Sequence, residues 1–184
     1  RTSAIPKLIK ALEFLLSDLG MGNARFSMKA IPTSSYFANG KDELEFLFSA
    51  NKGGNFGALK KVASGGELSR IMLSVKKVLS ENMQLPTIIF DEIDTGVSGE
   101  VSNKIAAIMQ QMSVNMQVIA ITHLPQIAAK GSNHYKVYKE EIHGITTTNL
   151  KELSSEERIF EIAEMLSGKE ISDTALTHAK ELLN

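Results

Sequence analysis

Two short runs of apolar, β-favouring residues, 87–90 and 118–121, constrain the fold of this chain more than any other feature. Between them, apolar residues recur at helical spacing over residues 101–112. A strand, a helix and a second strand at this separation form a βαβ unit, in which the two strands run parallel. Continuous apolar runs are typical of strands that are covered on both faces. The sequence therefore predicts an α/β fold with a parallel sheet at its core.

The flanking segments extend this core into one α/β domain without repeats or linkers. Helical spacing predicts further amphipathic helices over about residues 6–19, 68–79, 154–166 and 173–183. Alternating apolar residues predict strands near residues 26–30 and 44–48, joined by the polar segment 33–40, and a hairpin over residues 135–150. With 184 residues, of which 43% are hydrophobic, the chain is large enough to bury a core of its own.

The composition excludes several classes of protein. The sequence contains no cysteine, so it has neither a disulfide framework nor a thiolate metal site. It shows no apolar run near the roughly 18 residues of a membrane span and no secretory signal, so we expect a cytoplasmic protein without a membrane partner. The net charge of −1 lacks the basic surplus of a free-standing DNA-binding domain.

Two adjacent carboxylates, Asp91 and Glu92, follow the first apolar strand. The carboxyl edge of a parallel sheet is where ligands bind in open α/β folds. Asp91 can hold Mg²⁺ beside the phosphates of a nucleotide, and Glu92 can orient and deprotonate the attacking water as a general base. The alternative is a strand that ends in a solvated acidic turn.

A glycine-rich segment, residues 63–67, comes immediately before the helix expected at 68–79. Gly65 and Gly66 let the backbone approach a ligand closely, and the start of the helix offers unpaired N–H groups to an anion. Ser64 adds a hydroxyl donor, so the segment suits the γ-phosphate of ATP. The alternative is a glycine turn in which Ser64 caps the helix.

His123 and Asp94 are the remaining candidates. His123 follows the second apolar strand and emerges at the same sheet edge as Asp91, where it can hydrogen-bond a γ-phosphate or the attacking water. The alternative is a structural histidine. Asp94 begins a turn just after Glu92, and it either reaches across an interface or caps that turn; the sequence alone favours the cap.

In their order along the chain, these segments resemble the second half of the motif set of ABC-type ATPases. Residues 63–67 are similar to the signature motif, with alanine where transporters usually carry leucine. Asp91 and Glu92 resemble the Walker B aspartate and catalytic glutamate, Asp94 the D-loop aspartate, and His123 the H-loop histidine.

The longer stretches of sequence around these motifs point to a particular family within this class. Residues 62–70, 90–99 and 122–126 are similar to the RecN family of SMC-like DNA-repair ATPases, and the resemblance runs from about Leu19 to the C-terminus. It implies that residues 1–19 are the end of a returning coiled-coil helix. Residues 20–184 would be the C-terminal lobe of an ABC/SMC-type P-loop ATPase head, with a mainly parallel sheet flanked by helices and additional antiparallel strands.

The resemblance also implies roles for the site residues. Glu92 and His123 would be catalytic, and Asp91 would bind the metal. The residues in contact with the nucleotide would be Ser64, Gly65, Gly66, Glu67 and Asp94. Within this hypothesis Ser64, Asp91, Glu92 and His123 surround a triphosphate that another stretch of polypeptide holds.

One motif of the family is missing from the sequence. The P-loop pattern Gly-x-x-x-x-Gly-Lys-Ser/Thr does not occur. The family therefore implies an N-terminal half that carries the P-loop, and this chain should be a poor or inactive ATPase alone. It further implies ATP and Mg²⁺ as cofactors, an ATP-dependent homodimer of heads, and DNA contact through the full-length protein. The setting would be double-strand-break repair and recombination in the cytoplasm, at the nucleoid. The alternatives are the head of another SMC-like repair ATPase and a non-catalytic module for head engagement.

Overall fold

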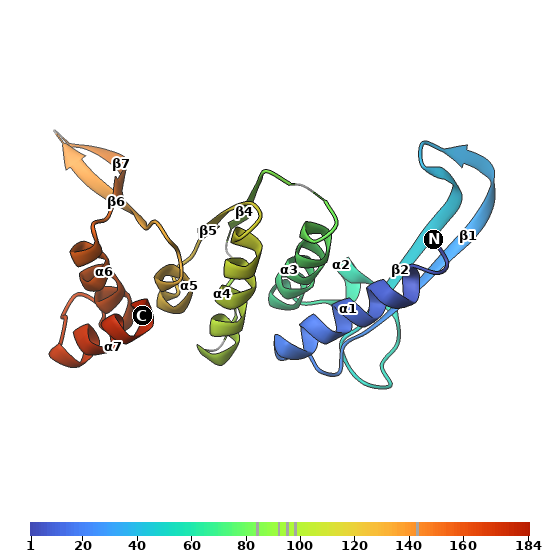
Figure 1. The fold of residues 1–184 in the computed structure, drawn as a ribbon, viewed down its shortest axis with the longest axis horizontal. Helices are drawn as coiled ribbons and strands as arrows, with labels where there is room; N and C mark the ends of the chain where they lie inside the picture. The colour runs from blue at the N-terminus through green and yellow to red at the C-terminus, as the bar shows by residue number, and fades with distance from the viewer. Residues whose placement is uncertain (84, 92, 95, 98, 143) are drawn as a thin grey trace.

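The structure is a computed structural model that describes residues 1–83, 85–91, 93–94, 96–97, 99–142 and 144–184. Its elements follow one another in a row along the longest axis of the molecule (Figure 1). The helices are α1 (Ile5–Asp18), α2 (Leu59–Val62), α3 (Gly65–Ser80), α4 (Gly99–Ser113), α5 (Pro125–Ala129), α6 (Ser155–Ser167) and α7 (Asp173–Leu183). The strands are β1 (Arg25–Phe37), β2 (Gly40–Ser49), β3 (Gly57–Ala58), β4 (Thr87–Asp91), β5 (Gln117–Ile121), β6 (Tyr135–Ile142) and β7 (Ile145–Glu152).

The N-terminal part combines α1 with the antiparallel sheet β1–β2–β3. The register pairs Phe26 with Phe48, which places the expected apolar positions of both strands on one face. That face packs with Leu12 and Leu16 of α1 in one hydrophobic cluster, and the Phe26 ring also stacks on Phe46 with centroids 5.2 Å apart. The predicted first helix and the two strands are therefore confirmed. Whether α1 continues a coiled coil stays a prediction.

The polar segment that follows residue 32 was wrongly expected to be a connection. Residues 33–37 belong to β1, and the pairing with β2 continues to Phe37 opposite Gly40. The register shifts between Pro32 and Phe37, which accommodates extra residues on β1 as a bulge does. The Thr33 hydroxyl bridges this irregularity, because its one proton lies within hydrogen-bond reach of two carbonyl oxygens, that of Ser35 (2.8 Å from Oγ1) and that of Lys41 (3.0 Å).

The predicted βαβ unit is confirmed. Strands β4 and β5 pair in parallel, from Thr87 opposite Gln117 to Asp91 opposite Ile121, and α4 connects them. In the described residues this is the only parallel pair, so the parallel sheet is smaller than expected. Its core face and α4 share the largest hydrophobic cluster of the chain, which includes Ile88, Phe90, Ile105, Met109 and Met112.

The expectation that both faces of this sheet are covered is wrong for the described residues. Ile88 and Phe90 are buried, but Ile89, which points to the other face, is 60% exposed. On the same face Ile119 is 42% exposed and Ile121 is 54% exposed. A parallel sheet normally has both faces covered, so this apolar face lacks a layer that its sequence pattern anticipates.

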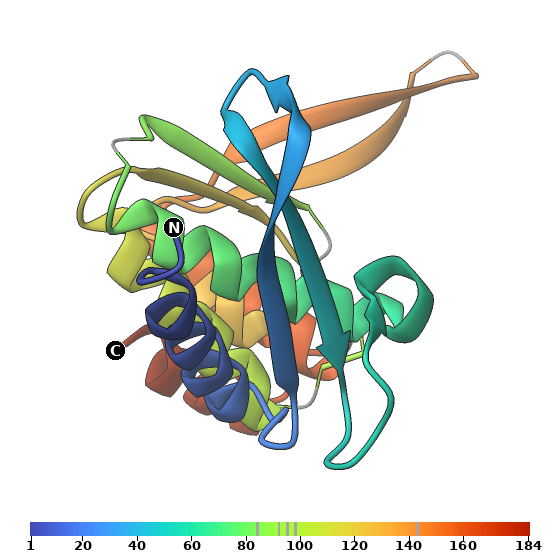
Figure 2. The ribbon, with the colours of Figure 1, turned by 90° about the vertical axis from the view of Figure 1, so that its right-hand side faces the viewer.

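The C-terminal part consists of the β6–β7 hairpin and the helix pair α6–α7. Ser154 and Glu157 form the expected capping box at the start of α6. The hairpin projects from the helices (Figures 1 and 2), and Lys136 ties its base to Glu161 and Glu164 of α6. No helix in the described ranges has the length and apolar character needed to cross a membrane.

Candidate functional site

The carboxyl edge of the β4–β5 sheet brings together three of the expected site residues. Asp91 is the last residue of β4, lies opposite Ile121 and is exposed. The chain leaves β5 through Thr122 and His123, one residue further along the same edge. Asp91 and His123 therefore lie on neighbouring strand ends, as predicted. Glu92, the expected general base, lies outside the described residues.

Asp94 lies beneath this edge rather than on its surface. Its side chain is completely buried. Its Oδ2 atom accepts a short hydrogen bond from the Thr122 hydroxyl and a second one, 3.1 Å long, from the backbone N–H of His123. The other carboxylate oxygen, Oδ1, is buried without a hydrogen-bond partner among the described residues. Asp94 thus joins the loop after β4 to the loop after β5 within one chain.

His123 is held by its backbone and exposes its ring. The side chain is 74% exposed, and its Nδ1 atom lies 3.3 Å from Oδ2 of Asp94. The Thr122 hydroxyl oxygen also accepts from the N–H of Leu124 at 3.0 Å, so the turn is fixed on both sides of the histidine. With Nδ1 facing Asp94, Nε2 is the ring nitrogen that faces away from the protein.

The second group of expected site residues forms the start of α3. Ser64 is the N-cap, and it makes a reciprocal capping box with Glu67. The Ser64 N–H donates to Glu67 Oε2 over 2.7 Å, and the Ser64 hydroxyl donates to the same oxygen over 2.8 Å. These two bonds hold the pKa of Glu67 below its usual value, and the bond from the Ser64 backbone N–H has the larger effect. The expected alternative of a helix cap is therefore confirmed, and contact with a phosphate stays a prediction.

The space at this helix start remains open. A side chain added at Gly65 would meet nothing within 4 Å. In the described part of the chain, the side-chain hydrogen bonds of Ser64 all involve Glu67, so no hydrogen bond links Ser64 to Asp91 or His123 there. Figure 2 shows that the α3 end nearest α2 and the ends of β4 and β5 lie toward the same side of the molecule. The expected site residues thus lie at two places, the start of α3 and the edge of the β4–β5 sheet, and both face the same side of the molecule.

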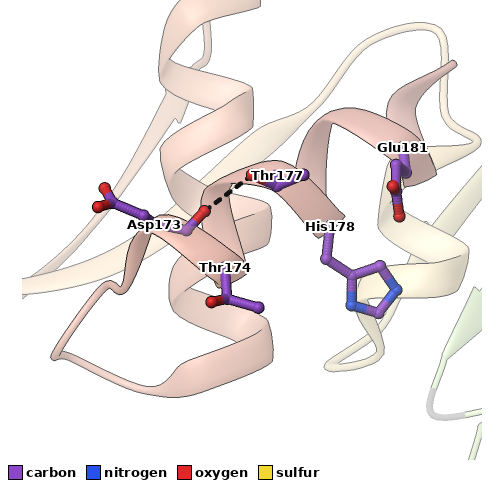
Figure 3. A pocket seen from close by; sticks show the side chains of 5 residues that line it. All are labelled: Asp173, Thr174, Thr177, His178 and Glu181. Carbon is purple, nitrogen blue, oxygen red and sulfur yellow. Dashed lines mark hydrogen bonds between the residues drawn. The ribbon is translucent and has the colours of Figure 1, made fainter.

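Other parts of the surface offer less chemistry. A shallow depression along α7 is lined by Asp173, Thr174, Thr177, His178 and Glu181, and it includes none of the expected site residues (Figure 3). Within the residues that can be described, no group of three or more His, Cys, Asp and Glu side chains is arranged to hold a metal ion. The metal role of Asp91 therefore stays a prediction, since protein Mg²⁺ sites use only one or two carboxylates together with substrate phosphates.

Thr122 was missed as a member of the site. The sequence does contain a signal for it, because Thr122 follows β5 directly, and parallel pairing brings that position beside the loop after β4. What the sequence does not show is that Asp94 turns inward to meet it.

The fold defines the class of protein. The Smc head domain of Pyrococcus yayanosii, solved with a coiled coil and joint, matches with a TM-score of 0.65 at 17% identity, over 90% of this chain and 30% of that one. A structure of an SMC ATPase, from work on ATP-driven dimerization and DNA-stimulated activation, matches with a TM-score of 0.55 at 18% identity, over 89% of this chain and 92% of that one. These likenesses show the fold of an SMC-type ATPase head, as predicted.

The sequence comparisons narrow this class to one family. The DNA repair protein RecN of Halalkalibacterium halodurans is 41% identical over 182 residues, which are 97% of this chain and 32% of the relative. RecN of Bacillus subtilis is 49% identical over 144 residues, which are 78% of this chain and 25% of the relative. The chain belongs to the RecN family and spans between a quarter and a third of these relatives' length. No protein-family model matches it.

Proposed function

We propose that this chain is the C-terminal part of a RecN-type ATPase head, which binds and hydrolyses ATP where two heads engage. The observation that carries the proposal is the sheet edge: Asp91 and His123 lie at the carboxyl ends of two neighbouring parallel strands, where α/β proteins bind nucleotides. Similarity to DNA repair proteins of the RecN family supports a role in DNA repair. Within that role we propose double-strand-break repair and recombination as the setting.

In this proposal each residue at the carboxyl edge of the β4–β5 sheet has its own role in phosphoryl transfer. Asp91 would hold Mg²⁺, directly or through water, and the ion would neutralise charge on the phosphates. Glu92 follows Asp91 directly in sequence and would take the proton of the attacking water. His123, with its Nε2 facing outward, would hydrogen-bond the γ-phosphate or that water.

The start of α3 would act on a second nucleotide, which the partner head holds. Ser64 caps α3 and bonds to Glu67, whereas Asp91 ends β4 and His123 follows β5. These two locations support the proposal that one chain contributes to two different sites. The hydroxyl of Ser64, the N–H groups of Gly65 and Gly66 and the positive end of the helix all favour an anion. Glu67 would leave its bond to the Ser64 hydroxyl when the phosphate arrives.

The rest of the protein would supply the P-loop. This chain has no P-loop sequence, and its relatives are three to four times as long as the stretch that matches. The exposed isoleucine face of β4–β5 supports a missing layer, because it is apolar and belongs to a parallel pair. The proposed partners are therefore the N-terminal half of the same protein, a second head, and DNA bound by the full-length protein in the cytoplasm at the nucleoid.

The test uses the full-length protein. Replacing Glu92→Gln should slow ATP turnover by roughly 10²–10⁴-fold while ATP binding persists, because only the base is lost. The matched control is Glu181→Gln on the exposed surface of α7, which should turn over ATP at the wild-type rate. Full turnover by the Glu92 variant would rule out the base role and revive the non-catalytic alternative.

Head engagement is tested separately. Ser64→Arg places a long cation at the start of α3 and should abolish ATP-dependent dimerization, measured by light scattering. Ser154→Arg is the matched control, because Ser154 is also an exposed N-cap serine in a capping box. If the Ser64 variant dimerizes normally with ATP, the start of α3 does not contact the partner's nucleotide.

A further inference from the structure

We propose that Asp94 is a positioning residue for the hydrolysis reaction, acting inside its own chain through Thr122 and His123 rather than touching the nucleotide. This inference rests on the proposed function. It concerns how the histidine is oriented, and it assigns Asp94 a role different from the nucleotide contact that the sequence resemblance implies.

The burial of Asp94 excludes a direct contact. Its side chain has no exposed surface, whereas the His123 side chain is 74% exposed. A carboxylate that is buried this completely must be compensated by hydrogen bonds or positive charge. In the described residues its hydrogen bonds come from the Thr122 hydroxyl and the His123 N–H, so the compensation comes from the turn that carries the histidine.

The bonds fix the backbone of that turn. The Thr122 hydroxyl has a single proton, which goes to Asp94, and its oxygen accepts the Leu124 N–H over 3.0 Å. The His123 N–H is taken up by Asp94 over 3.1 Å. Consecutive polar groups on both sides of the His123 side chain are thereby satisfied, and the turn has little freedom to rotate.

The carboxylate also selects which nitrogen the ring presents. Oδ2 lies 3.3 Å from Nδ1, so a proton on Nδ1 is attracted to the carboxylate and a lone pair there is repelled. The neutral ring then carries its proton on Nδ1 and leaves Nε2 as an acceptor at the sheet edge. Protonation of the ring adds an N–H donor at that same outward atom. In this proposal Asp94 therefore holds the backbone that carries His123 and favours one tautomer of its ring.

Only one oxygen of the Asp94 carboxylate is hydrogen-bonded to the described residues. Oδ1 is buried without a partner among the described residues, and a half-satisfied buried carboxylate costs free energy. The bonds that this carboxylate does make among the described residues are all made by Oδ2 and all go to the turn that carries His123.

The experiment measures kcat and KM for ATP in the full-length protein. Asp94→Asn keeps the shape but removes the charge. It should lower kcat by roughly 10–100-fold, the range seen for groups that orient a functional histidine, with KM for ATP changed by less than about threefold. Asp18→Asn, at the exposed end of α1, is the matched control and should leave both constants unchanged.

A double variant decides whether Asp94 acts through His123. In a His123→Ala background, Asp94→Asn should lower kcat by no more than about twofold further, because the side chain that it orients is gone. If Asp94→Asn costs the same factor with and without the histidine, the positioning role is refuted while the ATPase proposal stands. If His123→Ala itself keeps full kcat, the proposed role of His123 fails as well.

A second pair of variants covers the possibility that changes at Asp94 prevent folding. Thr122→Ser keeps the hydroxyl and should keep kcat within about twofold, whereas Thr122→Val removes the hydroxyl at nearly equal volume and should lower kcat about tenfold. Equal activity of the two Thr122 variants would overturn the inference.

Discussion

The uncovered face of β4–β5 predicts that the same substitution at two neighbouring residues costs very different amounts of stability. Ile88 and Ile89 are adjacent in β4, but Ile88 is 6% exposed and Ile89 is 60% exposed. Replacing Ile88→Ala leaves a cavity in the core and should cost about 2–5 kcal/mol in the free energy of unfolding. Ile89 has only about two-fifths of its surface buried, so Ile89→Ala should cost at most about 1 kcal/mol, taking 1.5–3 kcal/mol for a fully buried isoleucine.

The comparison is made twice, in this chain and in the full-length protein, by urea denaturation with circular dichroism. If the rest of the protein covers the sheet, Ile89→Ala becomes a core substitution there, and its cost should rise to about 2–5 kcal/mol. The Ile88 variant serves as the control, because its cost should be similar in both proteins. A cost for Ile89→Ala that stays below about 1 kcal/mol in the full-length protein would refute the proposal that another layer covers this face.

Three further predictions concern single side chains of this chain. Phe48→Ala should lower the free energy of unfolding by about 3–5 kcal/mol in urea denaturation, because Phe48 is completely buried in the cluster that β1 and β2 form with α1. A loss under about 1 kcal/mol would contradict the packing. The carboxyl of Glu157 has a pKa lowered to about 2, chiefly by its hydrogen bond with Lys151. Lys151→Ala should therefore raise the pKa of Glu157 toward 4.5 in an NMR titration. An unchanged pKa would show that the ion pair does not form. The pKa of Glu67 is lowered in the folded chain, so the stabilisation that Glu67 gives α3 is complete above the ordinary pKa of 4.5 and is lost as the pH falls through the folded pKa. Glu67→Gln should abolish this part of the acid dependence when the free energy of unfolding is measured over a series of pH values.

The sequence predicted those helices and strands that are specified by residues within or next to the element itself. The last helix was expected over residues 173–183 and is found at Asp173–Leu183, because a serine cap and a regular apolar stripe define it. Strand β4 was identified by its apolar run, but the sequence could not show that Ile89 remains exposed. Within the described residues nothing buries that face, and we propose that the rest of the protein covers it. The short helix α2 was not predicted, since four residues are too few for a periodic pattern to be visible.

The sequence predicted where the candidate site residues lie in the fold but not the hydrogen bonds between them. Parallel pairing placed Asp91 and His123 at one edge, as the βαβ pattern requires. The inward turn of Asp94 was not foreseen, because the contact with Thr122 joins residues 28 positions apart and depends on the path of the loop. Ser64 illustrates the opposite case, since a serine three residues before a glutamate specifies a capping box locally, whatever else that hydroxyl does.

The pairing of β4 and β5 only with each other, within the described residues, has a practical consequence for anyone who produces this chain alone. Each strand leaves one row of backbone N–H and C=O groups free, and such edges are templates on which strands of neighbouring molecules add. If the rest of the protein adds a strand to this sheet, as proposed, the same edge groups can bind a strand of another molecule when that part is absent. Production together with the remainder of the protein should therefore suppress aggregation, and short segments that imitate the absent strand would serve as soluble blockers of self-association.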